Sequence, residues 1–140
     1  MQKLSFEEAV EQITAADRRY QPEAYTFLRD ALDLTQRRVH RDRKQAGLHV
    51  TVPQLIQGCR DHALAQFGPM ALMVLEEWGV RSCEDLGNVL FNLVEANQFS
   101  VTDQDRREQF AEGFDFQEAF RKPFVPSGKA ADKPAPAPKQ

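Results

Sequence analysis

The sequence has few cysteines and no long hydrophobic run. Its two cysteines, Cys59 and Cys83, cannot build the disulfide framework of a small secreted domain, which favours a reducing cytoplasm. The longest apolar run, Met70–Leu75, has six residues, whereas a membrane-spanning helix needs about 20. Charged residues follow Ser5 where a signal peptide needs an apolar core. We therefore expect a cytoplasmic protein with no membrane partner.

Several catalytic signatures are also missing. The sequence contains no glycine-rich phosphate loop, no nucleophile elbow and no His-Glu-x-x-His motif. It has no fixed period of 20 to 50 residues either, which argues against a solenoid. The common nucleotide-binding, hydrolase and zinc-protease classes are therefore not predicted.

Charge is present in both signs but is unevenly spread. The 140 residues include 18 basic and 21 acidic side chains, and this length fits one domain. Residues 36–50 contain five basic residues against one acidic, whereas residues 76–118 contain three basic against eleven acidic. Such asymmetry bears on partners and association rates rather than on the fold.

Capping signals and apolar periodicity predict a mainly α fold. Ser5 with Glu8 and Thr51 with Gln54 form capping boxes, and Trp78-Gly79-Val80 is typical of a Schellman ending. Apolar residues recur at steps of three and four between these signals. The expected helices cover residues 5–17, 22–44, 52–67, 70–78, 82–96 and 102–113, with one more turn at 115–120.

Two short segments favour extended structure. Leu48–Val52 and Phe99–Val101 are strand candidates, and their pairing would give a two-stranded element in a winged-helix-like order. We thus predict a compact domain of about six helices over residues 1–125, with this small β element. Residues 126–140, rich in Pro, Ala and Lys, predict a disordered tail.

The run Met70–Leu75 is apolar on every side of a helix, so it should be central. With the two helices flanking it, the run is expected to form one dry interior that leaves no cavity for chemistry.

Metal and nucleophile sites are weakly supported. Cys59, His62 and Cys83 offer three ligands, whereas a closed zinc site uses four. Cys59 lies on an apolar line, which favours a buried thiol. Cys83 lies beside Glu84 and Asp85, whose charge should raise its pKa and oppose a thiolate. We expect no metal, no cofactor and no catalytic residue.

A basic cluster offers a nucleic-acid site. Its basic side chains could bind the phosphates of a nucleic-acid backbone. They could equally be a solvated helix C-terminus, where the helix dipole favours positive charge. No aromatic residue lies among them, as base stacking would need. The cluster consists of Arg37, Arg38, Arg41, Arg43 and Lys44.

A polar line interrupts the apolar helix at residues 82–96. Asn88, Asn92 and Glu95 form this line, which is either the wall of a ligand pocket or the exposed edge of a core helix. At the recognition position of a winged helix this segment would recognise DNA bases poorly, because it offers no Arg or Lys.

Five of the ten phenylalanines lie within residues 110–124. They form either a strap that docks on the helical core or a segment that enters a partner's groove. In the second interpretation the partner-binding residues are Phe116, Phe120 and Phe124.

Two distinctive turns carry a family resemblance: Phe67-Gly68-Pro69-Met70 and Trp78-Gly79-Val80-Arg81. Together with residues 91–95 and 114–120, they resemble a small family of conserved hypothetical proteins that is largely restricted to planctomycete and verrucomicrobial bacteria. The resemblance covers residues 5–124 and implies a bacterial cytoplasmic protein. It supplies no activity, so no functional residue is carried over from it.

The sequence therefore favours a non-enzymatic protein-binding or adaptor module. The alternative is a nucleic-acid- or ribosome-associated protein that uses the basic cluster. A cofactor-free enzyme ranks third, supported only by His49, His62 and the Asn88 line.

Overall fold

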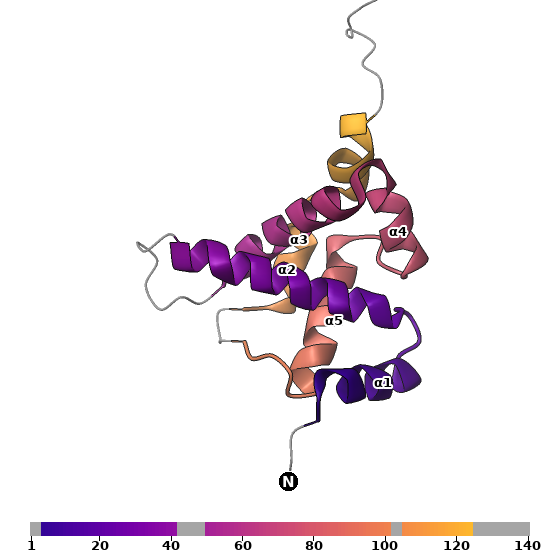
Figure 1. The fold of residues 1–140 in the computed structure, drawn as a ribbon, viewed down its shortest axis with the longest axis vertical. Helices are drawn as coiled ribbons and strands as arrows, with labels where there is room; N and C mark the ends of the chain where they lie inside the picture. The colour runs from indigo at the N-terminus through magenta and orange to yellow at the C-terminus, as the bar shows by residue number, and fades with distance from the viewer. Residues whose placement is uncertain (1–3, 42–49, 102–104, 125–140) are drawn as a thin grey trace, which may run out of the picture.

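A computed structural model describes residues 4–41, 50–101 and 105–124, without the side chains of residues 40 and 41 (Figure 1). The chain is mainly helical, as predicted. The α-helices of the described residues are α1 (Phe6–Ala16), α2 (Pro22–Arg41), α3 (Val52–Phe67), α4 (Ala71–Glu77) and α5 (Cys83–Glu95). The short helical turns are η2 (Gly68–Met70), η3 (Arg107–Glu112), η4 (Gln117–Arg121) and η5 (Lys122–Phe124).

The helix α2 crosses the middle of the molecule. It packs against both α3 and α5, while α1 and α4 lie toward opposite ends (Figure 1). The turns η3 and η4 return to the helices, with η3 against α5 and η4 against α4. Helices from all parts of the described chain therefore share one core.

The predicted capping boxes form as expected. Ser5 Oγ accepts from the Glu8 amide at 3.1 Å, and Glu8 Oε1 accepts from the Ser5 amide at 3.0 Å. Thr51 and Gln54 make the same exchange at 3.3 and 2.9 Å. Each box satisfies two backbone N–H groups that the first helical turn leaves without partners, and so fixes where α1 and α3 begin.

The predicted Schellman ending of α4 is also confirmed. The Val80 amide donates to the Leu75 carbonyl at 2.8 Å, and the Gly79 amide donates to the Glu76 carbonyl at 3.0 Å. Gly79 has φ of 92°, in the region that favours glycine. This turn sends the chain from α4 into α5.

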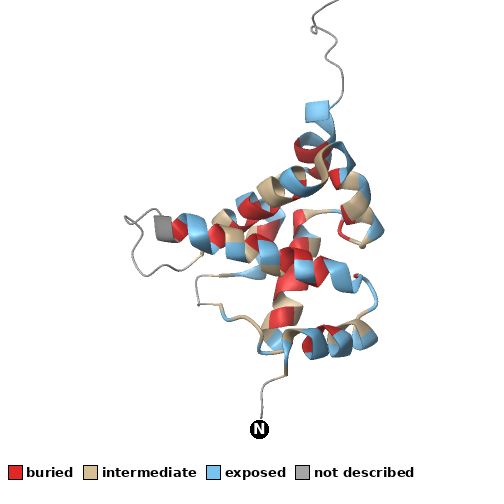
Figure 2. Cartoon of the chain, in the orientation of Figure 1, coloured by how far each residue is buried: buried red, intermediate tan, exposed pale blue. Residues whose placement is uncertain are grey.

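The core is built around α2, α3 and α5 (Figure 2). The expectation that α5 is mostly buried is confirmed, since only Glu84 and Glu95 of its residues are exposed. Cys59 and Cys83 are both buried free thiols. The largest fully buried side chains include Tyr25, Leu28, Leu75, Leu93, Phe110 and Phe120.

The expected central position of Met70–Leu75 is wrong. Only Ala71 and Leu75 of this run are buried, while Met70 and Met73 are 49% and 53% exposed. The helix α4 has seven residues and lies at the edge of the molecule, at the right in Figure 1. Its neighbours α3, η2 and η4 cover part of its circumference and leave the methionine side open. The hydrophobic core is therefore centred on α2, α3 and α5 and not on this run.

The predicted β element is absent from the residues that the structure describes. Phe99–Val101 has no strand pairing, and Val52 is the first residue of α3. The Thr51 cap outweighs the β propensity of Val50 and Val52, because it starts a helix that buries an apolar face. Residues 50–52 and Phe99–Val101 line one small hollow, about 40 Å³ in volume.

Some sequence predictions fall outside the described residues. These are the tail at residues 126–140, the side chain of Arg41, and the residues Arg43, Lys44 and His49.

Candidate functional site

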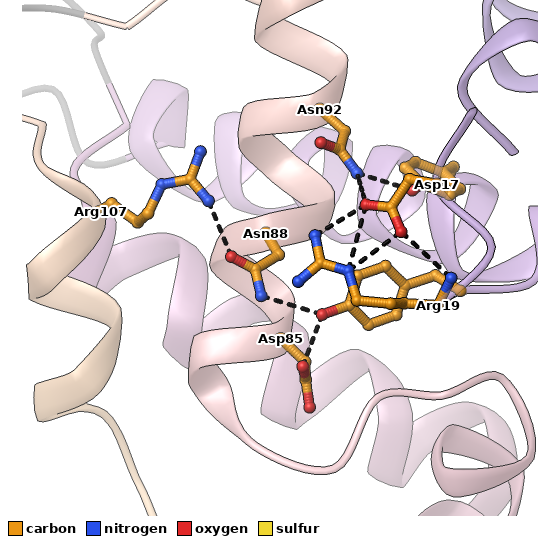
Figure 3. Close-up of polar contacts among 8 residues, drawn as sticks. Asp17, Arg19, Asp85, Asn88, Asn92 and Arg107 are labelled. Atoms are coloured by element: carbon orange, nitrogen blue, oxygen red, sulfur yellow. Dashed lines mark hydrogen bonds and ion pairs between the residues drawn. The ribbon is translucent and has the colours of Figure 1, made fainter.

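The polar line on α5 faces the connection between α1 and α2. Asn88 Nδ2 donates to the Tyr20 hydroxyl at 2.9 Å, and this hydroxyl donates to Asp85 Oδ1 at 2.5 Å (Figure 3). Asp85 also accepts from the Arg81 amide at 2.9 Å. These bonds belong to a group that we call the polar seam: Asp17, Arg19, Tyr20, Tyr25, Asp85, Asn88, Asn92 and Arg107.

Asn92 makes the second half of the polar seam. Its Nδ2 donates to Asp17 Oδ2 and to the Tyr25 hydroxyl, both at 3.0 Å. Arg19 pairs with Asp17 at 2.7 Å. Hydrogen bonds from the Arg19 side chain hold the pKa of Asp17 well below its ordinary value of 3.8, because they favour the carboxylate. Asn88 and Asn92 are thus bonded within the fold, whereas Glu95 is exposed.

A polar hollow adjoins the outer end of the polar seam. It measures about 420 Å³ and is lined in part by Asp85, Asn88 and Arg107. Arg107 donates to Asn88 Oδ1 at 2.8 Å and lies 4.9 Å above the Phe91 ring. Asn88 and Arg107 are therefore engaged with each other at the wall of the hollow.

The titration of Tyr20 bears on what this arrangement can do. Burial, and then the hydrogen bond to Asp85, raises the pKa of Tyr20 to about 12. The phenol therefore stays protonated at neutral pH and acts as a hydrogen-bond donor. The geometry supports a positioning role, in which α5 is fixed against the α1–α2 connection.

The Asp17 carboxylate should make stability depend on pH. Its folded pKa is depressed, so its contribution is present above the unfolded value of 3.8 and is lost as pH falls below it. We expect Asp17→Asn to lower the free energy of unfolding by about 1 kcal/mol at neutral pH. The variant should then lose less stability than wild type between pH 5 and pH 2 in urea titrations.

A matched control is Asp33→Asn on α2. Asp33 pairs with Arg37 on the surface and is 64% exposed, so solvent screening leaves this pair little effect on stability. Equal acid sensitivity in Asp17→Asn and wild type would contradict the role of Asp17.

The cysteines and His62 lie apart from the polar seam. Burial raises the pKa of Cys59, and it raises the pKa of Cys83 to about 11. For Cys83 the cause is burial, not the neighbouring acids that the sequence suggested. His62 packs 5.2 Å from the Phe27 ring, and burial lowers its pKa. Within the described ranges, no three His, Cys, Asp or Glu residues are placed to hold a metal.

The described members of the basic cluster have acidic partners. Arg37 pairs with Asp33 at 3.1 Å, and Arg38 reaches across to Asp61 of α3 at 2.8 Å. Both guanidinium groups are thus partly neutralised within the fold. Arg38 also joins α2 to α3.

The phenylalanine-rich segment docks on the core of its own chain. We call residues 107–124 the strap. The rings of Phe114, Phe116 and Phe120 lie 5.0 to 5.5 Å apart. Phe116 and Phe120 are 5% and 1% exposed, so in this fold they are not the exposed helical anchors that binding in a partner's groove requires. Phe124 is 44% exposed.

The helical turns beside α4 carry exposed apolar side chains. From the sequence, Met70 and Met73 are expected in the core and Phe124 is a candidate partner-binding residue. Met70, Met73 and Phe124 are the large hydrophobic residues that stand exposed within the described residues. The turn η4, which leads directly into η5, contacts both η2 and α4, and Figure 1 shows these elements at the same end. We call these three residues the methionine end.

Comparison of this chain with protein-family models, with curated proteins and with solved structures gives no match. No functional residue is therefore transferred from a relative. None of the helices in the described part of the chain is long and apolar enough to cross a membrane.

Proposed function

We propose that this chain is a non-enzymatic binding module of the bacterial cytoplasm that docks a protein partner at the methionine end. The single observation behind this proposal is the exposure of Met70, Met73 and Phe124 at one end of an otherwise well-packed domain. Grouped apolar side chains on a surface are typical of protein interaction sites.

Methionine suits such a surface for a physical reason. Its side chain is unbranched and polarizable, so it adapts to partners of different shape. Full burial of an exposed methionine side chain contributes about 1.5–3 kcal/mol, and about half of that is available here because both side chains are half exposed. Met70 and Met73 lie three residues apart on adjoining helical elements, so one partner segment can cover both.

The two turns that carry the family resemblance hold this end in place. Gly68 and Gly79 both have positive φ, at 51° and 92°. They lie before and after α4, so they set its position and its short length. The resemblance and the proposed docking surface therefore concern the same part of the chain.

Lysine at both methionines should abolish partner capture. In pull-downs from native bacterial lysate, we expect Met70→Lys/Met73→Lys to lose proteins that the wild-type chain retains. Both sites are about half exposed, so the free energy of unfolding should change by only about 0.5 kcal/mol. Charge placed on the apolar surface would oppose docking through its desolvation cost.

The control variant is Ala15→Lys/Ala16→Lys, which adds the same charge on exposed positions of α1. It should capture the same proteins as wild type. Identical capture by all three chains would refute docking at the methionine end. If nuclease instead removes the captured material, the basic cluster and a nucleic-acid partner replace this proposal.

A further inference from the structure

A groove lies between α1 and α2. Figure 1 shows α1 at the end of the fold opposite η5. It measures about 360 Å³. Apolar groups of Phe6, Val10 and Pro22 line it, together with three glutamates, Thr14, Thr26 and Arg29. The groove is therefore apolar with an acidic rim.

The rim charges are largely uncompensated. Glu7 and Glu11 are exposed and make no ion pair within the described residues. Glu8 accepts the Ser5 amide in the capping box but keeps its charge. Arg29, the cation of the rim, lies 4.5 Å above the Phe6 ring and 3.7 Å from Asp30. The groove thus favours a positively charged occupant.

We propose that the segment Lys133–Lys139 of this chain binds in the α1–α2 groove. Its sequence is Lys-Pro-Ala-Pro-Ala-Pro-Lys, which places apolar residues between two cations. The prolines and alanines match the apolar floor, and the lysines match the acidic rim. This inference does not depend on the proposed partner at the methionine end.

Proline explains how a segment can bind between two helices. The backbone groups inside α1 and α2 are already paired within their helices, so they cannot add a strand or bond a new backbone. A proline-rich segment brings few N–H donors that need a partner. The contact then depends on apolar packing and on charge.

The lengths also agree. The helix α1 has 11 residues, which corresponds to about 16 Å. A polyproline II conformation would place Lys133 and Lys139 about 19 Å apart. One lysine can then lie at each end of the groove. One end carries Glu7, and the other is the C-terminal end of α1, where backbone carbonyls carry partial negative charge and the last turn has no basic residue.

The reach of the chain determines whether the segment docks on its own copy or on a neighbouring one. Lys133 follows Phe124 by nine residues, which span up to about 30 Å when extended. Because η5 and α1 lie at opposite ends (Figure 1), the test must report on both arrangements.

The test is paramagnetic broadening in the full chain. Ala137→Cys carries a nitroxide label, while Cys59 and Cys83 are buried and therefore resist labelling. We expect backbone amide signals of α1 and the first turn of α2 to lose intensity selectively. This loss should shrink in high salt, because the Debye length falls to about 3 Å at 1 M. Mixing labelled chains with isotope-labelled, nitroxide-free chains assigns the contact to the same or another copy.

Charge variants decide whether the groove is responsible. Glu7→Lys/Glu11→Lys should abolish the selective broadening, and Glu7→Gln/Glu11→Gln should weaken it without reversing charge in the first turn. Adding Lys133→Glu/Lys139→Glu to the Glu7→Lys/Glu11→Lys variant should restore the broadening in part, because only the glutamate beside residues 7 and 11 meets opposite charge. The control Glu77→Lys/Glu112→Lys, on exposed sites elsewhere, should leave it intact. Broadening that spreads evenly over the surface, or that survives Glu7→Lys/Glu11→Lys, would overturn the proposal.

Discussion

Phe110→Ala should lower the free energy of unfolding by about 3–5 kcal/mol. The Phe110 side chain is fully buried, with its ring edge-on to Phe91 at 6.4 Å between centroids. It fits directly over Gly87 of α5, where an added Cβ would lie 2.8 Å from the ring. Alanine would leave a cavity between the strap and α5. Urea unfolding followed by circular dichroism measures the loss.

The matched control for Phe110→Ala is Phe124→Ala. Phe124 belongs to the same strap but is 44% exposed, so its truncation should change stability by only about 0.5 kcal/mol. Similar losses in the two variants would show that the strap does not dock as described.

Gly79→Ala is expected to cost about 2–5 kcal/mol. The positive φ of 92° disfavours any side chain, which accounts for about 1–2 kcal/mol. The new Cβ would also overlap the backbone carbonyl of Arg19, and relief of such a clash adds about 1–3 kcal/mol. Displacement of Arg19 would shift the neighbouring Asp17 and Tyr20. The melting temperature should therefore fall, and the hydrogen bonds of the polar seam should weaken.

Gly68→Ala separates these two costs. Gly68 also has positive φ, but an added Cβ would meet nothing within 4 Å. Only the backbone strain, about 1–2 kcal/mol, should remain. If Gly68→Ala proved as destabilising as Gly79→Ala, the contact with the Arg19 carbonyl would be unimportant.

The sequence predicted the elements whose signals are local. Ser5 with Glu8 and Thr51 with Gln54 mark helix starts because each pair acts within a single turn. Gly79 marks an ending for the same reason, since its backbone conformation is needed at that position. These features require no knowledge of distant neighbours.

The position of Met70–Leu75 could not be predicted in the same way. A run that is apolar on every side contains no periodicity, so it does not indicate which face packs. In the structure, α3, η2 and η4 cover part of α4. Whether Met70 and Met73 are buried depends on where the strap returns, and no local signal specifies that path.

The polar seam was missed because its partners are distant in sequence. Tyr20 and Asp85 are separated by 65 residues, and Asp17 and Asn92 by 75. The i, i+4 spacing of Asn88 and Asn92 indicated one face of a helix. It could not distinguish solvent, a ligand or buried side chains of another element as the groups that this face meets.

The late position of the strap has a consequence for biosynthesis. Translation proceeds from the N-terminus, so α1 to α5 leave the ribosome before the rings of Phe110, Phe116 and Phe120 are available. Until then, the nascent chain exposes the apolar surfaces of α3 and α5 that these rings later cover. Completion of the native fold must therefore wait for the strap, and chaperones can recognise the growing polypeptide during that interval.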